Sequence, residues 1–261
     1  MSPWLELCRA AVRDVEAVLA AMPTREERER PVGRGQGGDV TAALDEAAER
    51  VVLAHLDRPG VRIVSEEIGI RGEGPLTVVV DPIDGSQNAE RAIPYFALCV
   101  AVAEGPTMAD VVFGFVHDFG SREEWTAVKG GGAFLDGAPI TQGPKDHLEF
   151  LSIEATRAAL VYDRLRVLGP LTDRVRVMGA QALTYCHLAA GRTDAVAVLR
   201  PSRAVDYAAG QLLIRERGLA IELADDPPIG AAPLDLVGRS RVVAAANDEL
   251  VRTLSEALLT P

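Results

Sequence analysis

Two aspartates stand where an apolar run of the sequence ends, and they are the first residues whose types and spacing suggest chemistry. The run Leu76-Thr77-Val78-Val79-Val80 is typical of a buried strand, and Asp81 follows it directly. Pro82 interrupts the strand ladder at that point, and Asp84 comes two residues later. Two carboxylates at the end of a buried strand would repel each other and lose hydration unless a cation joined them. The pair therefore indicates a divalent metal site.

Gly85 and Ser86 extend this segment toward phosphate binding. A glycine lets backbone amides approach a phosphate closely, and a helix that starts after it adds its positive end. The residues from Asp81 to Ser86 could thus hold both a metal ion and a phosphate. Taken alone, they also fit an ordinary turn in which both aspartates only cap the backbone, because Asp-Gly is common in turns.

Acidic residues in three other segments favour the metal site over the turn. Glu66 follows a strand in Ser65-Glu66-Glu67, Asp206 lies in the segment from Arg203 to Gly210, and Asp39 and Asp45 flank the start of a helix. Ligation by oxygen alone suits Mg²⁺ or Mn²⁺, whereas zinc prefers nitrogen and sulfur. These segments therefore favour a divalent metal site over an ordinary turn.

These segments, in this order, resemble the inositol monophosphatase family, a group of metal-dependent, lithium-sensitive sugar-phosphate phosphatases. The family pattern has an acidic helix start after a glycine-rich loop, a Glu-Glu pair, the Asp-Pro-Ile-Asp-Gly-Ser block and an Asp followed by Ala-Ala-Gly. Here it spans roughly residues 33 to 218. The resemblance implies an α/β (α+β) fold, a layered αβαβα sandwich of the sugar-phosphatase type with the metal site between two halves. It also implies a homodimer.

The resemblance assigns metal-binding roles to the residues at the matching positions. It implies two or three Mg²⁺ ions, with Mn²⁺ as a substitute. One ion would bind Glu66, Asp81 and the backbone carbonyl of Ile83, a second would bind Asp81, Asp84 and Asp206, and Glu66 would help to hold the third. The implied reaction is an in-line attack of water on phosphorus, assisted by ions that lower the pKa of water and stabilise the departing alkoxide.

In the family, a carboxylate at the helix start works with the hydroxyl at the end of the acidic block to orient the attacking water. The hydroxyl here belongs to Ser86, and Asp45 is the predicted carboxylate because it follows Thr41 in the family manner. Asp39 is the alternative, since the spacing from Thr41 to Asp45 is a residue longer than in many relatives. The predicted catalytic residues are thus Asp45, Glu66 and Ser86.

The expected substrate is a small phosphate monoester, with inositol 1-phosphate first and fructose 1,6-bisphosphate second. Histidinol phosphate and phosphoadenosine phosphate are alternatives within the same chemistry. Gly85 and Ser86 are expected to contact the substrate, as are Arg200 and Arg203 through paired hydrogen bonds, with surface ion pairing as the alternative for both arginines. The contrasting hypothesis is a non-catalytic regulator that binds a sugar phosphate, and a lost metal ligand would favour it.

Composition excludes some partners and suggests a location. The formal net charge of -11 argues against nucleic acid or an anionic membrane as the main partner, because both need a positive surface. No leader-like segment and no apolar run of about 18 residues is present, so the expected location is the cytoplasm. Cys8, Cys99 and Cys186 lie in apolar surroundings and are expected to be buried free thiols.

Periodicity predicts the elements that must position these residues. Helices are expected at about 3–22 and 41–56, the second with Asp39 or Thr41 as its N-cap, and a mobile loop over Arg25–Gly38. Strands are expected at about 62–65, 77–81, 96–103 and 111–117, with shorter segments at 125–128 and 133–135. The rest alternates strands at 150–154, 174–178, 194–199, 218–223 and 241–246 with helices at 157–168, 180–190, 204–217 and 247–259. A boundary near residue 146 divides an N-terminal α+β half, 1–146, from a C-terminal α/β half, 147–261.

Overall fold

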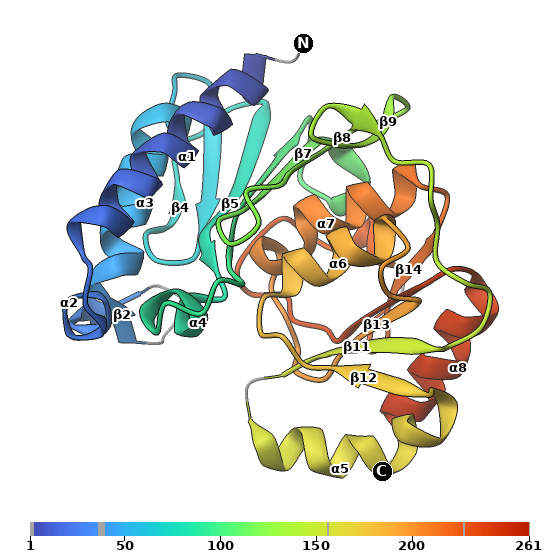
Figure 1. Ribbon diagram of the computed structural model, residues 1–261. Coiled ribbons are helices and arrows are strands. Elements are labelled where there is room, and N and C mark those ends of the chain that lie inside the picture. Colours follow the sequence, from blue (N-terminus) through green and yellow to red (C-terminus); the bar gives the residue numbers. More distant parts are fainter. Residues whose placement is uncertain (1–2, 36–39, 156, 227, 261) are drawn as a thin grey trace.

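The protein is described by a computed structural model that covers residues 3–35, 40–155, 157–226 and 228–260. These residues form five alternating layers of helices and sheets (Figure 1). The arrangement is the αβαβα sandwich that the sequence predicts. Within the described residues, no helix is both long and apolar enough to cross a membrane.

The three helical layers come from different parts of the chain. Helices α1 (Pro3–Ala21) and α3 (Ala43–Leu56) pack side by side on one face of an eight-stranded sheet. Helices α6 (Gln181–Ala189) and α7 (Ala204–Glu216) lie between that sheet and a five-stranded sheet. Helices α5 (Ala158–Leu168) and α8 (Asp248–Leu259) form the last layer.

The eight-stranded sheet sets the position of two acidic residues. Its β3 and β5 run parallel with Ser65 paired to Val80, so Glu66 and Asp81 follow at the same edge of the sheet. The pairing of β5 with β6 becomes irregular between Asp81 and Asp84. In spatial order the strands are β10 (Ala138–Pro139), β9 (Gly132–Leu135), β8 (Glu124–Val128), β7 (Val111–Asp118), β6 (Ala97–Ala103), β5 (Leu76–Asp84), β3 (Val61–Ser65) and β4 (Gly69–Arg71).

The five-stranded sheet belongs to the second half of the chain. Its β11 and β13 run parallel, with Glu154 paired to Val198 at their carboxyl ends. In spatial order its strands are β12 (Arg174–Arg176), β11 (Phe150–Glu154), β13 (Ala195–Val198), β15 (Val242–Ala245) and β14 (Ala220–Leu223).

The largest hydrophobic cluster lies around α6 and α7 and joins both halves of the chain. It includes Val79 of β5, Leu183 of α6, Leu212 of α7 and Val242 of β15, all buried. The two helices approach closely at Gly210, where a Cβ would lie 2.3 Å from Cδ2 of Tyr185. A side chain at this position would therefore push α7 away from α6 and shift the elements that both helices support.

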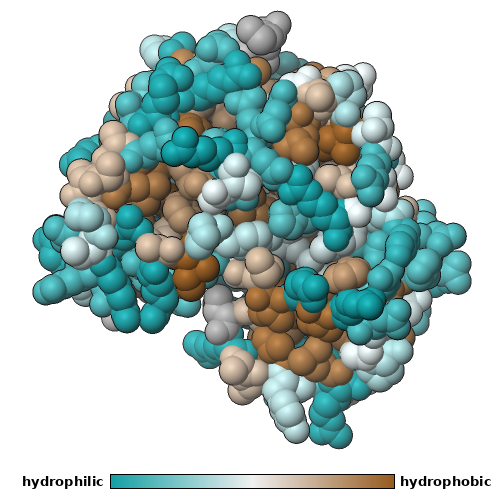
Figure 2. Space-filling view, viewed as in Figure 1, coloured by the Kyte–Doolittle hydropathy of each residue, from teal (hydrophilic) through white to brown (hydrophobic). Residues whose placement is uncertain are grey.

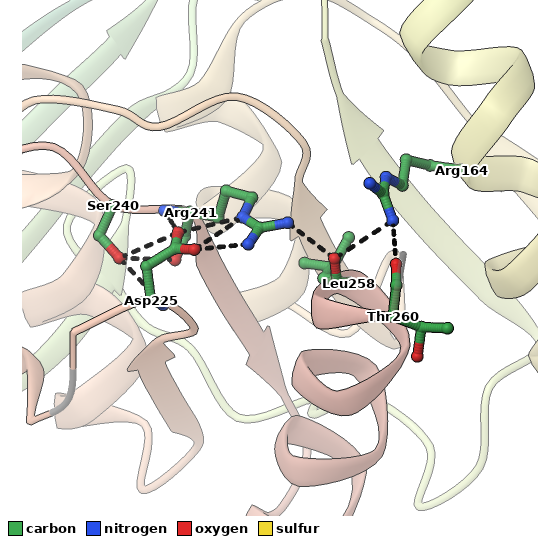
Figure 3. Close-up of polar contacts among 6 residues, drawn as sticks. All are labelled: Arg164, Asp225, Ser240, Arg241, Leu258 and Thr260. Carbon is green, nitrogen blue, oxygen red and sulfur yellow. Dashed lines mark hydrogen bonds and ion pairs between the residues drawn. The ribbon is translucent and has the colours of Figure 1, made fainter.

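Two arginines tie the end of α8 to its neighbours (Figure 3). The Arg241 guanidinium pairs with Asp225 and donates a hydrogen bond to the Leu258 carbonyl at 2.7 Å. Arg164 of α5 donates to the carbonyls of Leu258 and Thr260 at 3.3 and 2.5 Å. Cations near the last carbonyls of a helix satisfy acceptors that have no partner within the helix. The last layer is thereby fixed to the loop before β15.

Several predictions from the sequence agree with the structure. Every strand and helix expected after residue 150 is found, with ends that differ by a few residues at most. At the predicted start of the last helix, Asn247 caps α8 by accepting a hydrogen bond from the Leu250 amide at 3.0 Å. The three cysteines are buried and free, as expected.

Other predictions were wrong, and the reasons are local. Part of the expected mobile loop Arg25–Gly38 is ordered as α2 (Arg25–Glu29), which has a Thr24 capping box, and as β1 (Pro31–Arg34), which pairs with β2 (Val40–Ala42). Thr41 does not cap α3, because its hydroxyl donates to Glu67 instead. Asp39 lies outside the described residues. Strand β4, which follows the Glu66-Glu67 turn, was missed because it has only three residues.

Candidate active site

Three of the predicted metal ligands converge at one edge of the eight-stranded sheet. Glu66 follows β3, Asp81 lies in β5, and Asp206 lies in the first turn of α7. Each of them offers one carboxylate oxygen, and these oxygens lie within 4.8 Å of one another. The parallel pairing of β3 with β5 supplies two members, and the packing of α7 against β5 supplies the third.

The carboxylates of Glu66, Asp81 and Asp206 lie so close together that a cation between them would stabilise their charged forms. Burial raises the pKa of Asp81 well above its usual range, and the carboxylates of Glu66 and Asp84 raise it further. Burial, followed by the charge of Glu66, raises the pKa of Asp206 to about 6. Carboxylates held this close cannot all ionise comfortably without positive charge between them. The described residues bring together carboxylate oxygens without a nitrogen or sulfur ligand, and this set fits Mg²⁺ or Mn²⁺.

Asp84 is beside this group but is bonded differently. Its two carboxylate oxygens accept hydrogen bonds from the Gln181 and Ala182 amides at 3.1 and 2.7 Å. These amides are the first of α6, so Asp84 of the N-terminal half caps a helix of the C-terminal half. Burial raises its pKa well above the usual range, although the two amides act against that. Each oxygen keeps a lone pair with which it can bind a cation.

Arg203 forms a buried ion pair rather than the surface ion pair that was the alternative for it. Its buried guanidinium pairs with Glu66, and its backbone amide donates to Asp206 at 2.7 Å. The Nε and Nη1 atoms of Arg203 are buried and have no hydrogen-bond partner among the described residues. Arg203 therefore supplies positive charge inside the acidic cluster.

Asp45 and Ser86 lie on the other side of the same cluster. Asp45 is in the first turn of α3, where burial and then the charge of Glu67 raise its pKa to about 7. Ser86 begins α4 (Ser86–Glu90) after Gly85, which has a φ of 88°. A Cβ on Gly85 would lie 3.0 Å from the Gly179 carbonyl oxygen, so this turn needs glycine. Both Asp45 and Ser86 line a cavity that also reaches Asp81.

Two cavities meet at the acidic cluster. The larger, about 480 Å³, is lined by Asp45, Glu67, Glu90 and Arg157, and we call it the α3-side cavity. The smaller, about 240 Å³, is lined by Asp206, Gln181, Arg203 and Arg239, and we call it the α6-side cavity. The residues that line both are Glu66, Asp81, Ile83, Ser86, Gln87 and Arg200. The shared wall is therefore where a phosphate would contact both spaces.

Glu49 is a site residue that the sequence reading missed. This buried carboxylate on α3 accepts hydrogen bonds from the Ser65 hydroxyl and from the Glu67 and Ile68 amides, the latter two at 3.3 and 3.2 Å. It thereby shapes the turn that carries Glu66. The signal was present in the sequence, because Glu49 falls on the apolar stripe of its helix with Val52 and Leu56.

Glu67 is half-buried, and its carboxylate accepts a hydrogen bond from the Thr41 hydroxyl. Burial raises the pKa of Glu67, with the charges of Glu66 and Glu49 adding to the rise. The turn after β3 thus brings two adjacent carboxylates toward the site, one paired with Arg203 and one with Thr41.

We expect removal of Mg²⁺ to destabilise the protein more at about pH 8 than at about pH 5. The pKa of Asp206 rises from 3.8 to about 6 in the folded protein, so the folded state holds a proton that the unfolded chain releases. The free energy of unfolding of the metal-free protein should therefore fall as pH rises through this interval. A bound cation offsets the repulsion once the groups ionise.

Thermal unfolding measured with and without Mg²⁺ at both pH values checks this expectation, with NaCl at equal ionic strength as the control. The increase in Tm caused by Mg²⁺ should be larger at the higher pH. A Tm that Mg²⁺ leaves unchanged at both pH values would contradict a cation site in this cluster.

Comparison with known proteins adds independent information. Residues 2–259 match the model of the inositol monophosphatase family. The chain is 34% identical over 260 residues to a fructose-1,6-bisphosphatase/inositol-1-monophosphatase of Thermococcus kodakarensis, covering 98% of this chain and 97% of the relative. A relative of the same name from Methanothermobacter thermautotrophicus is 32% identical over 270 residues, covering 98% and 96%. The crystal structure of an inositol monophosphatase-fructose 1,6-bisphosphatase superposes with a TM-score of 0.85 at 28% identity, covering 98% of this chain and all of the other.

Proposed function

Because the chain belongs to the inositol monophosphatase family, we propose that it is a Mg²⁺-dependent phosphomonoesterase that hydrolyses inositol 1-phosphate, with fructose 1,6-bisphosphate as a second substrate. The observation that carries the proposal is the convergence of carboxylate oxygens from Glu66, Asp81 and Asp206 at the meeting point of two cavities. The names of the two relatives support both substrates.

The proposed metal ligands are the side chains of Glu66, Asp81, Asp84 and Asp206 and the carbonyl of Ile83. These would hold two or three Mg²⁺ ions, or Mn²⁺ in their place. When bound, such ions supply positive charge that neutralises the phosphate and lowers the pKa of water. The contacts that support the assignment are the carboxylate triad and the position of Asp84 beside it in β5.

The chain's own residues then orient the reactants. We assign Asp45 to accept a proton from the attacking water and Ser86 to hold that water by a hydrogen bond. Burial keeps the pKa of Asp45 near 7, which suits a group that exchanges a proton at neutral pH. Asp45 lines the α3-side cavity, so the water approaches from that side.

The position of the water fixes the place of the leaving alcohol. In an in-line displacement the nucleophile and the leaving group lie on opposite sides of phosphorus. With water on the α3 side, the sugar or polyol occupies the α6-side cavity, which Gln181, Arg203 and Asp206 line. The phosphate between them would contact Gly85, Ser86 and Arg200 on the walls of the site. Arg203 would contact the departing part of the substrate.

A phosphate-release screen tests the function directly. Inositol 1-phosphate, fructose 1,6-bisphosphate, histidinol phosphate and phosphoadenosine phosphate are each supplied with and without Mg²⁺. We expect release from the first two only when Mg²⁺ is present. Preference for either of the last two would replace the substrate within the same chemistry. If the folded protein releases phosphate from none of the four substrates, the result would favour the regulator that binds sugar phosphates without turnover.

We also propose that the enzyme works as a lithium-sensitive homodimer in the cytoplasm. Figure 2 shows hydrophobic side chains gathered on one face at the place of β11 and β12 in Figure 1. Val177 and Met178, which follow the edge strand β12, are 44% and 42% exposed. Such a patch beside an unpaired sheet edge supports association of two copies. The free buried cysteines support a reducing compartment.

A further inference from the structure

Arg239 lines the α6-side cavity, and nothing in the proposed chemistry uses it. It is exposed, and it forms no ion pair with any residue that the structure describes. We propose that Arg239 binds a second phosphate carried by the leaving alcohol, and that it thereby selects sugar bisphosphates. This inference rests on the proposed function, because it uses the side on which the alcohol leaves.

The charge of the cavity wall explains why such a cation would be needed. Five carboxylates line this cavity, namely those of Glu66, Asp81, Asp84, Glu154 and Asp206. The ions proposed at the cluster neutralise the phosphate that is transferred, but a second phosphate farther along the substrate would still face acidic side chains. An arginine on the outer wall offsets that repulsion and can form paired hydrogen bonds with phosphate.

The other arginines of this cavity have different positions. Arg203 is buried and paired with Glu66, next to the reacting centre. Arg200 lines both cavities, so it belongs to the wall that the transferred phosphate contacts. Arg239 lines the α6-side cavity and not the α3-side one.

The backbone directly after Arg239 is held by hydrogen bonds and an ion pair. The Ser202 amide donates to the Ser240 carbonyl at 2.8 Å, and the Ser240 amide donates back to the Ser202 carbonyl at 3.2 Å. The next residue, Arg241, is fixed by Asp225 (Figure 3). The Arg239 side chain therefore extends from a backbone that is anchored to Ser202 on its C-terminal side, and binding needs to order that side chain.

Arg239→Gln tests the inference, with Arg252→Gln as the matched control, because Arg252 is exposed on α8 and lines neither cavity. We expect Arg239→Gln to lower kcat/KM for fructose 1,6-bisphosphate by about tenfold, chiefly through KM, since a charge-assisted hydrogen bond is lost. For inositol 1-phosphate, which has no second phosphate, kcat/KM should stay within about twofold. Arg239→Lys should restore part of the loss, because it restores the charge.

The possible results distinguish the inference about Arg239 from the proposed phosphatase function. Equal effects of Arg239→Gln on both substrates, or no effect on either, would overturn the inference. A wild-type enzyme that hydrolyses inositol 1-phosphate but not the bisphosphate would also overturn it, while the proposed hydrolysis of inositol 1-phosphate stands and the second substrate is removed. A wild-type protein that releases phosphate from neither substrate would refute the proposed function itself.

Discussion

Asp84→Asn is expected to abolish Mg²⁺-dependent phosphate release, with a loss in kcat of at least about a thousandfold. The substitution removes a full negative charge from a carboxylate proposed to bind the cation. It also replaces one of the two acceptors for the amides of Gln181 and Ala182 with a donor. Steady-state release of phosphate from inositol 1-phosphate over a range of Mg²⁺ concentrations measures the loss.

The loss must be separated from simple destabilisation of α6. Asp194 offers a matched control, because it is buried, accepts hydrogen bonds from the Lys145, Glu149 and Phe150 amides, and lines neither cavity. Asp194→Asn should lower Tm by an amount comparable to that of Asp84→Asn and keep most of the turnover. Undiminished turnover in Asp84→Asn would refute the metal assignment of this residue.

Asp45→Asn is expected to lower kcat by about 10²- to 10⁴-fold, the usual range for a lost general base. An amide cannot accept the proton that the attacking water releases. The sign of the pH dependence follows from the same role, because only the ionised carboxylate can take that proton. The wild-type rate should therefore rise as pH rises through the pKa of Asp45, which burial places at about 7 without a cation and which a nearby cation would lower.

The pH profile distinguishes this role from a structural one. In Asp45→Asn the residual rate should no longer show the rising limb that the wild-type enzyme shows. Glu46→Gln, at the next position of α3 and exposed, is the control and should keep both the rate and its pH dependence. A kcat within a few-fold of wild type, or a rising limb unchanged in Asp45→Asn, would remove Asp45 from the reaction.

Much of the fold could be predicted because local patterns and tertiary packing agree. The apolar run before Asp81 forms a strand in which every residue after Leu76 is buried. The alternating pattern beyond residue 150 corresponds to the strands and helices of the structure. Short elements held by local contacts were the failures, such as α2 with its Thr24 capping box and the three-residue β4. A boundary near residue 146 stays a prediction, and the cluster around α6 and α7 joins the two sides of it.

The candidate site was predictable where the sequence carries the motifs of the family. The acids at positions 66, 81 and 206 could be named because they stand at the family's motif positions, and the chain folds to bring them together. Contacts that depend on long-range packing could not be predicted from residue positions in this way. The capping of α6 by Asp84, the burial of Arg203 against Glu66 and the cavity position of Arg239 all depend on how the two halves meet.

The most direct test of the magnesium-dependent phosphatase is the rate of phosphate release from inositol 1-phosphate by the wild-type protein after chelation of divalent ions. We expect no release in the chelated protein, and a rate that saturates as Mg²⁺ is added back, with Mn²⁺ as a partial substitute. Release that continues unchanged in the presence of chelator would contradict the carboxylate cluster as a metal site. A folded protein that releases no phosphate from inositol 1-phosphate at saturating Mg²⁺ would contradict the assignment of this substrate.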